Sequence, residues 1–363
     1  MPLPLFDTSA SVAPLRPRID AAVARVLDSG AFILGPEVDA FEREFADYLG
    51  VKHVVGVANG TDALTIALQA LGVGPGDEVV VPSFTFYASA EAIPPTGASP
   101  VFCDVDRETM NVTAETVRAV LTPRTRAIVA VDLFGNPAPL PALHALGIPI
   151  VEDAAQAAGA SLGEHRAGAL GTLGTFSFYP SKNLGAFGDG GAIATDDDDL
   201  AEAVRVLRFH GSKDKVTYQR IGWNSRLDEL QAAILRVLLP ELDAWSAGRR
   251  QAAEHYRDAG LGELVTLPQA TPGATPAWHL HVIQHARAAE LEQALNAAGI
   301  GARGYYRTPL HRQEALLPWA DRVDLPVTDE LARTHLAIPV NPLLTREHAD
   351  EVVAAIRTAL AAV

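Results

Sequence analysis

The sequence predicts an α/β fold in which a large domain, built on a doubly wound and mostly parallel mixed sheet, precedes a smaller α+β domain. Through most of the large domain, short apolar runs alternate with helical patterns, which is typical of parallel strands joined by helices. A long apolar helix then ends near residues 245–250, and a second, shorter set of elements follows. We therefore expect a large domain over residues 1–247 and a small domain over residues 248–363.

The composition limits the classes of function. The 363 residues are 48% hydrophobic and 20% charged, which fits a globular chain with a large core. The formal net charge of −15 argues against a nucleic-acid surface but still allows local binding of small anions. The single cysteine, Cys103, excludes an internal disulfide and a cysteine-based zinc site, and we expect no metal. With no signal peptide and no apolar run of about 18 residues, we expect a cytoplasmic protein outside the membrane.

The N-terminal elements lead to a candidate anion site. Residues 17–28 and 36–50 have apolar positions at helical spacing, and residues 52–57 form a short strand. Asn59, Gly60 and Thr61 follow as a turn that can cap the next helix. A helix that starts after a strand directs free N–H groups and its dipole at one point, where an anion can bind. Taken alone, such a capped helix is common in α/β proteins.

Further strands are expected at residues 78–81, 96–106, 123–135 and 148–151. In doubly wound sheets, ligands bind at the carboxyl ends of the strands. Ser83–Phe86 and Asp153 lie at two such ends, as does the turn at Asn59. We expect these residues to share one edge of the sheet.

Lys182 is the centre of the most distinctive stretch, FSFYPSKNLGAFGDGG at residues 176–191. Four glycines follow it, and the nearest lysines are Lys52 and Lys213. Desolvation in such a setting would lower the pKa of the amine and make it a nucleophile towards carbonyl groups. The alternative is a surface lysine on a glycine-rich loop.

After residue 191 we expect a short strand at residues 192–196, followed by a helix. Asp196–Asp199 should be a solvated turn that caps a helix ending near Phe209. Pro240 should kink the apolar helix over residues 227–245. The expected elements of the small domain are a strand at 278–284, a helix at 288–299, a loop with a short strand at 299–313 and a final helix at 345–363.

Six segments, in order, resemble the DegT/DnrJ/EryC1/StrS family of sugar aminotransferases. They are residues 59–64, 74–86, 152–156, 177–191, 224–235 and 308–313. The resemblance implies the fold-type I scaffold, which is aspartate-aminotransferase-like, and the cofactor pyridoxal 5′-phosphate (PLP). Some family members carry histidine in place of the lysine and perform dehydration, so Lys182 favours transamination.

The resemblance also implies roles for the residues around the cofactor ring. Lys182 would form the Schiff base with PLP and carry the proton. Asp153 would keep the pyridine nitrogen protonated, with a helix cap as the structural alternative. Gln156 matches the residue that binds the phenolic oxygen. Phe86 would lie on the outer face of the ring, with core packing as its alternative.

The same resemblance implies a phosphate site that two subunits share. Gly60, Thr61 and Ser177 match the neutral donors to the phosphate. Asn224 matches an asparagine that, in the family, comes from the neighbouring subunit. The expected partner is therefore a second copy of the chain, in a homodimer whose sites cross the interface.

Substrate residues are less defined. Arg226 is either a structural partner of Asp228 or a substrate contact. Residues 305–307, Tyr-Tyr-Arg, replace the His-Tyr-Pro of many family members, so Tyr306 is a candidate substrate contact. His311 is a further candidate, with a structural role as its alternative. In the same loop, Arg303, Arg307 and Arg312 would either meet a diphosphate or form a solvated face.

The function that the resemblance implies is transfer of an amino group from an amino acid, with glutamate expected, to a C3 or C4 keto group of a nucleotide-linked deoxysugar. The segment at 210–219 resembles C3-acting members. One alternative is a cyclitol aminotransferase that uses a keto-inositol and glutamine. Others are a PLP-binding regulatory protein without turnover and a nucleotide-binding oxidoreductase. The lack of a G-x-G-x-x-G motif at the first helix argues against the oxidoreductase.

Overall fold

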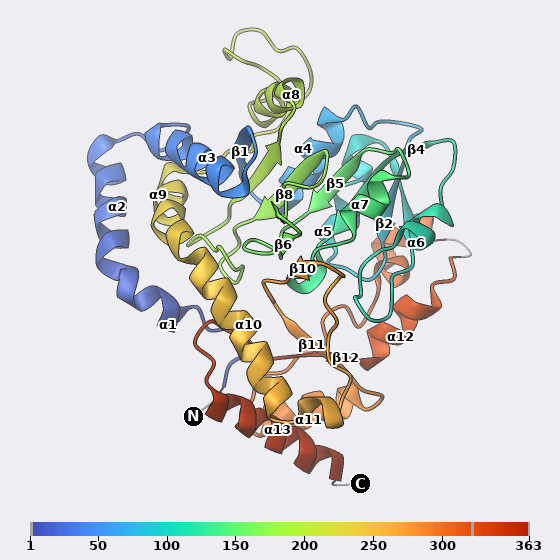
Figure 1. The fold of residues 1–363 in the computed structure, drawn as a ribbon. Coiled ribbons are helices and arrows are strands. Elements are labelled where there is room, and N and C mark those ends of the chain that lie inside the picture. Colours follow the sequence, from blue (N-terminus) through green and yellow to red (C-terminus); the bar gives the residue numbers. More distant parts are fainter. Residues whose placement is uncertain (1–2, 321–322, 362–363) are drawn as a thin grey trace.

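The computed structural model describes residues 3–320 and 323–361 and is organised around a seven-stranded sheet (Figure 1). Its strand order is β1-β9-β8-β5-β4-β2-β3, and β9 runs antiparallel to both of its neighbours. The pairs of β8, β5, β4, β2 and β3 are parallel, so the expected mixed, mostly parallel sheet is confirmed. The strands are β1 His53–Val57, β2 Glu78–Pro82, β3 Ser99–Cys103, β4 Thr125–Val131, β5 Ile150–Asp153, β8 Leu173–Ser177 and β9 Gly191–Thr195.

Helices cover both faces of this sheet. Val54 and Val55, adjacent on β1, belong to two different apolar clusters, because successive side chains of a strand point to opposite faces. One cluster packs α4 against β2, β4 and β5, and the other packs α2, α3 and α9 against β1 and β8. The helices of this part are α1 Ser9–Val12, α2 Arg16–Ser29, α3 Pro36–Leu49, α4 Gly60–Ala70, α5 Ala88–Glu91, α6 Ala114–Arg118, α7 Leu140–His144, α8 Asp198–Arg208 and α9 Glu229–Leu238.

The C-terminal part has its own apolar cluster, which includes Leu3 from the start of the chain and Tyr256. Helix α10 runs through the boundary expected at 247/248, and the division into two domains stays a prediction. The elements are β11 His281–Gln284, β12 His335–Ile338, α10 Leu242–Asp258, α11 Ala288–Ala297, α12 Pro326–Thr334 and α13 Arg346–Ala361.

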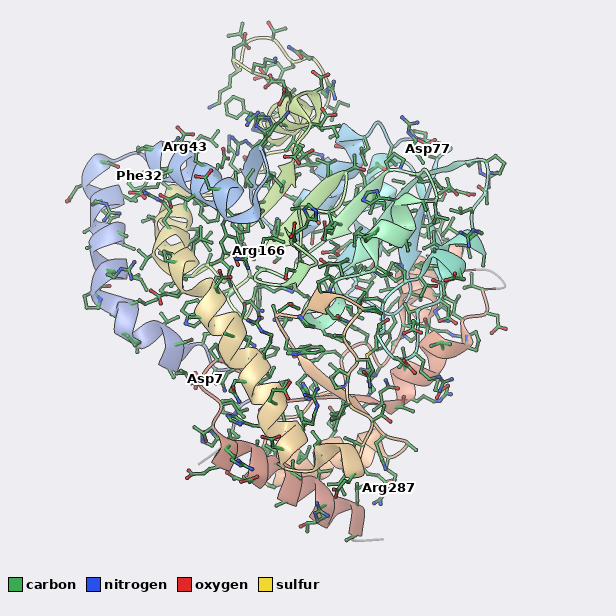
Figure 2. All side chains as sticks on the ribbon, in the orientation of Figure 1. Asp7, Phe32, Arg43, Asp77, Arg166 and Arg287 are labelled. Carbon is green, nitrogen blue, oxygen red and sulfur yellow. The ribbon has the colours of Figure 1, made fainter. Side chains whose placement is uncertain are left out.

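A small sheet, β10-β6-β7, was not expected from the sequence. Its strands are β6 Ser161–Leu162, β7 His165–Arg166 and β10 Ala274–Thr275. Arg166, labelled in Figure 2, forms two 2.8 Å hydrogen bonds with Asp243, which ties this sheet to α10. Strands of two residues carry too short a pattern to be recognised from sequence.

Two local predictions are confirmed and one is wrong. Pro240 lies in a 3₁₀ turn, Leu239–Glu241, that separates α9 from α10. Asp197 caps α8 by accepting hydrogen bonds from two backbone N–H groups. The short strand expected within residues 299–313 is reduced to an isolated bridge between Arg303 and Ala337. Among the helices described, none is both long and apolar enough to cross a bilayer.

Candidate active site

Lys182 lies in the loop between β8 and β9. Three backbone hydrogen bonds close this loop: Phe178 N to Gly190 O (2.8 Å), Lys182 N to Tyr179 O (2.8 Å) and Ala186 N to Phe178 O (2.7 Å). Burial lowers the pKa of Lys182 to about 8, because desolvation disfavours the ammonium form. The loop therefore holds a partly buried amine that deprotonates far more readily than a surface lysine.

Asp153 ends β5 at the carboxyl edge of the sheet. Its Oδ2 accepts a hydrogen bond from Ser89 Oγ (2.8 Å) and its Oδ1 accepts one from Ala155 N (3.2 Å). Burial raises the pKa of Asp153, while the Ser89 hydrogen bond and the positive charge of Lys182 act in the opposite direction. Asp153 in turn raises the pKa of Lys182, so the two candidate residues are electrostatically coupled.

Gly60 and Ser177 meet where α4 begins. A Cβ built on Gly60 would lie 2.8 Å from the Ser177 Cβ, so only glycine fits this contact without a shift. Asn59 caps the helix through a 2.8 Å hydrogen bond from Asp62 N to its side chain. The N–H groups of Gly60 and Thr61 belong to the first turn, where a helix leaves such groups without an intrahelical partner. A helix N-terminus and a hydroxyl thus face one point, as an anion requires.

Gln156 and Tyr306 connect the end of β5 to the C-terminal part. Gln156 Oε1 accepts from Phe134 N (2.9 Å), and Gln156 Nε2 donates to the Tyr306 hydroxyl (3.1 Å). The Phe134 and Tyr306 rings stack with centroids 5.9 Å apart and planes at 6°. Phe86 lies 6.3 Å from Tyr306 and is 55% exposed, so core packing does not explain its position.

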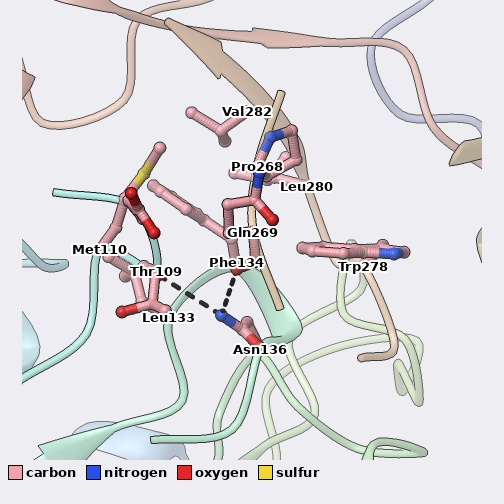
Figure 3. A pocket seen from close by; sticks show the side chains of 11 residues that line it. Thr109, Met110, Leu133, Phe134, Asn136, Pro268, Gln269, Trp278, Leu280 and Val282 are labelled. Atoms are coloured by element: carbon pink, nitrogen blue, oxygen red, sulfur yellow. Dashed lines mark hydrogen bonds between the residues drawn. The ribbon is translucent and has the colours of Figure 1, made fainter. Parts of the chain in front are cut away.

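A narrow, mainly apolar hollow lies behind Phe134 (Figure 3). Asn136 Nδ2 donates to Gln269 O (3.1 Å) at its wall. Met110, Phe134 and Trp278 all line the hollow and all have φ in the left-handed region, at 60°, 58° and 40°. Tyr306 shares this strain, at φ 70°. Such outliers persist only where surrounding packing imposes them, and here the packing keeps Phe134 against Tyr306.

Three other candidates, Asn224, Arg226 and His311, make their contacts with other residues. Asn224 is exposed and its backbone pairs with Phe209. The Arg226 guanidinium lies 5.9 Å from the Phe209 ring, and no ion pair between Arg226 and Asp228 occurs among the residues that the structure describes. His311 is buried, with its Nδ1 2.7 Å from Ser83 Oγ, which favours the structural alternative for this residue.

The arginines of the 303–313 loop are largely engaged. Arg307 Nη2 lies 2.9 Å from Glu292, and Arg312 Nη2 lies 2.7 Å from Asp329. Arg303 stacks over the Tyr305 ring at 5.2 Å. Two of the three positive charges are therefore neutralised within the chain.

Comparison with known proteins identifies the group to which this arrangement belongs. Residues 15–357 match the DegT/DnrJ/EryC1/StrS aminotransferase family. The chain belongs to this family. It is therefore an aminotransferase, and its cofactor is PLP, as the six sequence segments implied.

Relatives match the aminotransferase over nearly its whole length. A dTDP-3-amino-3,4,6-trideoxy-alpha-D-glucose transaminase from Streptomyces venezuelae is 45% identical over 98% of this chain and 95% of its own. A UDP-N-acetyl-3-dehydro-alpha-D-glucosamine 3-aminotransferase from Acidithiobacillus ferrooxidans is 44% identical over 99% and 98%. The crystal structure of S. venezuelae DesV in complex with a ketimine intermediate superposes with a TM-score of 0.95, at 45% identity over 98% of each chain.

The residues present fit PLP in the aminotransferase. Lys182 offers an amine of lowered pKa, and Asp153 offers a buried carboxylate with only two hydrogen bonds from the protein. The α4 N-terminus, at Gly60 and Ser177, offers the neutral donors that a phosphate needs.

Sequence reasoning missed three residues near Lys182. Ser89, in α5, was not recognised as a partner of Asp153, because a serine after an aromatic loop has no distinctive pattern. His279 and Arg249 are both buried, and burial together with the positive charges of Lys182 and Arg249 lowers the pKa of His279. Both come from elements distant in sequence, so only tertiary packing reveals them.

Proposed function

We propose that this aminotransferase moves an amino group from glutamate to the C3 keto group of a nucleotide-linked deoxysugar. The observation that carries the proposal is the coupling of Lys182, an amine with a pKa of about 8, to the buried Asp153 at the carboxyl edge of the sheet. The choice of C3 is supported by the two relatives named above, since both names place the amino group at C3.

Lys182 has two tasks in this proposal. When bound, PLP supplies a carbonyl that captures amines and a ring that withdraws electrons from the substrate carbon. The neutral Lys182 amine attaches the cofactor, and after release it carries a proton to and from the substrate carbon. Burial favours both tasks because, with a pKa of about 8, roughly a tenth of the amine is deprotonated at pH 7, far more than for a lysine of ordinary pKa.

The other residues bind and orient. Asp153 would hold a proton on the pyridine nitrogen, and Gln156 would bind the phenolic oxygen. Gly60, Thr61 and Ser177 would bind the phosphate, and Phe86 would cover the outer face of the ring. Tyr306, which accepts a hydrogen bond from Gln156 beside this group, would be a substrate-side residue.

Asn224 would complete the phosphate site of the neighbouring subunit in a homodimer. Its exposure in the single chain supports a role at an interface. Mixing inactive Lys182→Ala with inactive Asn224→Asp should restore activity in mixed dimers, since half of the sites in such a dimer can be intact. No recovery, with subunit exchange shown by a tag, would argue against the shared site.

The test of the reaction is a coupled assay of both half-reactions. Glutamate should remove the long-wavelength absorbance of the holoenzyme, and a dTDP- or UDP-linked 3-keto sugar should restore it with formation of a 3-amino sugar. A keto-inositol offered with glutamine tests the cyclitol alternative. If glutamate leaves the absorbance unchanged, glutamate is not the donor and the proposal fails.

A further inference from the structure

A pocket opens beside the Lys182 loop, between the N-terminal helix α1 and helix α10. Its empty space, counted together with the open solvent at its mouth, is about 470 Å³, and Lys182 forms part of its wall. Ser11 of α1 lies at one side, and Trp245 and Arg249 of α10 lie at another. None of the residues proposed above to bind the cofactor phosphate lines this pocket.

Arg249 is a charged wall residue that lacks an acidic partner. It is 5% exposed, and its Nη1 donates to the carbonyl oxygens of Trp278 (3.3 Å) and Val340 (3.1 Å). Its Nε is buried with no partner, and no carboxylate pairs with Arg249 among residues 3–320 and 323–361. A buried cation without an anion is costly, and the remaining N–H groups of a guanidinium form a fork that suits a carboxylate.

Asn183, next to Lys182, supplies the complementary group. Its Nδ2 donates to Ala277 O (3.1 Å), which fixes the amide, so its Oδ1 is an acceptor. This Oδ1 is buried and has no partner in the described structure. The pocket wall therefore contains a cation without an acidic partner and an acceptor without a donor, and a ligand that satisfies both has a carboxylate and an ammonium group.

Lys182 and Arg249 are close in space as well as in the pocket wall. Both lower the pKa of His279 by their positive charge, in addition to its burial. A carboxylate bound at Arg249 would thus lie near the amine that attaches the cofactor.

We propose that this pocket binds the amino-acid donor, with a donor carboxylate on Arg249 and its ammonium group on Asn183 Oδ1, before the amino nitrogen passes to the Lys182 site. This inference rests on the proposed function in one respect: it takes the donor to be an amino acid such as glutamate. It assigns the donor a subsite apart from the residues offered to the nucleotide sugar.

Calorimetric titration of the holoenzyme with 2-methyl-L-glutamate tests the binding directly, because this amino acid has no α-proton to transfer. Arg249→Lys keeps the charge but removes the fork, and should weaken binding about 10- to 100-fold. Ser11→Asp adds a negative charge to the pocket wall without altering Arg249, and should weaken binding about tenfold or more. Glutarate, which lacks the ammonium group, should bind more weakly than 2-methyl-L-glutamate.

Two matched variants lie outside the pocket wall. Ala10→Asp adds the same charge one residue from Ser11, at an exposed position, and Arg250→Gln removes the neighbouring arginine. Both should bind 2-methyl-L-glutamate as the unmodified protein does. If Ala10→Asp weakens binding as much as Ser11→Asp, or if neither Ser11→Asp nor a folded Arg249→Lys weakens it, the donor pocket is refuted.

The two half-reactions separate this inference from the proposed function. Arg249→Lys should slow the reaction with glutamate through a higher KM and leave the rate with the keto sugar from the amino-loaded enzyme unchanged. Equal losses in both half-reactions would indicate a structural role for Arg249 and overturn the inference. If no keto sugar is accepted while the binding results hold, the sugar assignment fails and the donor pocket stands.

Discussion

Glu152 and Asp153 are adjacent on β5, and both are buried carboxylates, but their surroundings differ. Glu152 accepts three backbone hydrogen bonds, from Gly168 N (2.7 Å), Leu170 N (2.8 Å) and Gly171 N (2.8 Å). Asp153, on the other face of the strand, accepts one from a hydroxyl and one longer one from an amide. Neighbouring residues of a strand point to opposite faces, so a single step along the chain separates the two environments.

The difference shows what each carboxylate is for. The Glu152 carboxylate accepts three backbone hydrogen bonds from the loop at 168–171, and it forms no ion pair among the described residues. This suits a residue that holds the loop in place. Burial and, after it, the negative charge of Glu152 raise the pKa of the nearby Asp132 well above its usual value. The Asp153 carboxylate accepts only two hydrogen bonds, so it can accept more, and it lies near Lys182. Both features suit a residue that binds a cationic ring nitrogen.

Asp153→Asn should give the largest effect in this comparison. The amide cannot hold a proton on a ring nitrogen, so kcat/KM should fall about 10²- to 10³-fold. Stability of the cofactor-free protein should change little, because Asp153 has few hydrogen bonds and its charge is disfavoured by burial. Steady-state kinetics and thermal unfolding measure the two outcomes. A large loss of stability with normal kinetics would reverse the roles of Asp153 and Glu152.

Glu152→Gln should show the opposite pattern. A glutamine side chain turns an NH₂ group towards one or two of the three N–H donors, and the free energy of unfolding should fall by about 2–4 kcal/mol. The kcat of the folded fraction should remain close to that of the unmodified protein. Urea unfolding and kinetics below the transition measure these quantities. A loss of kcat comparable to that of Asp153→Asn, in protein that is still folded, would contradict this separation.

The role proposed for Asp153 could be predicted from the sequence, whereas the role of Glu152 could not. Asp153 belongs to a short motif at the end of an apolar strand, where the alternation of strands and helices already predicts a ligand edge. The role of Glu152 depends on a loop that returns from residues 168–171, which no local pattern reveals. The same limit applies to Arg249, whose partners come from residues 278, 279 and 340. Long-range packing of irregular backbone, rather than periodicity, decides such contacts.

The pH dependence of cofactor uptake should reflect the pKa of Lys182, which burial lowers and the nearby Asp153 raises. With the pKa of Lys182 at about 8, the neutral amine increases about tenfold per pH unit below pH 8 and is nearly constant above it. The rate of PLP attachment to cofactor-free protein should follow this curve, measured by absorbance between pH 6 and 10. Asp153→Asn removes the negative charge that raises this pKa, so its midpoint should lie lower. A rate that still rises between pH 9 and 10 would show that Lys182 is not desolvated.

Tyr306→Phe should have the smallest effect on catalysis, because it removes only the hydroxyl that accepts a hydrogen bond from Gln156. The Gln156 Nε2 donor loses its 3.1 Å partner, which costs about 1 kcal/mol, while the ring stack on Phe134 remains. If Tyr306 is a substrate-side residue, KM for the keto sugar should rise about fivefold with KM for glutamate unchanged. A change in both KM values would instead indicate that the hydroxyl positions Gln156 against the cofactor. The PLP affinity of Tyr306→Phe then decides between the two roles, since only the positioning role predicts weaker PLP binding in this variant; Gln156→Leu, which removes the donor, shows how large that loss can be.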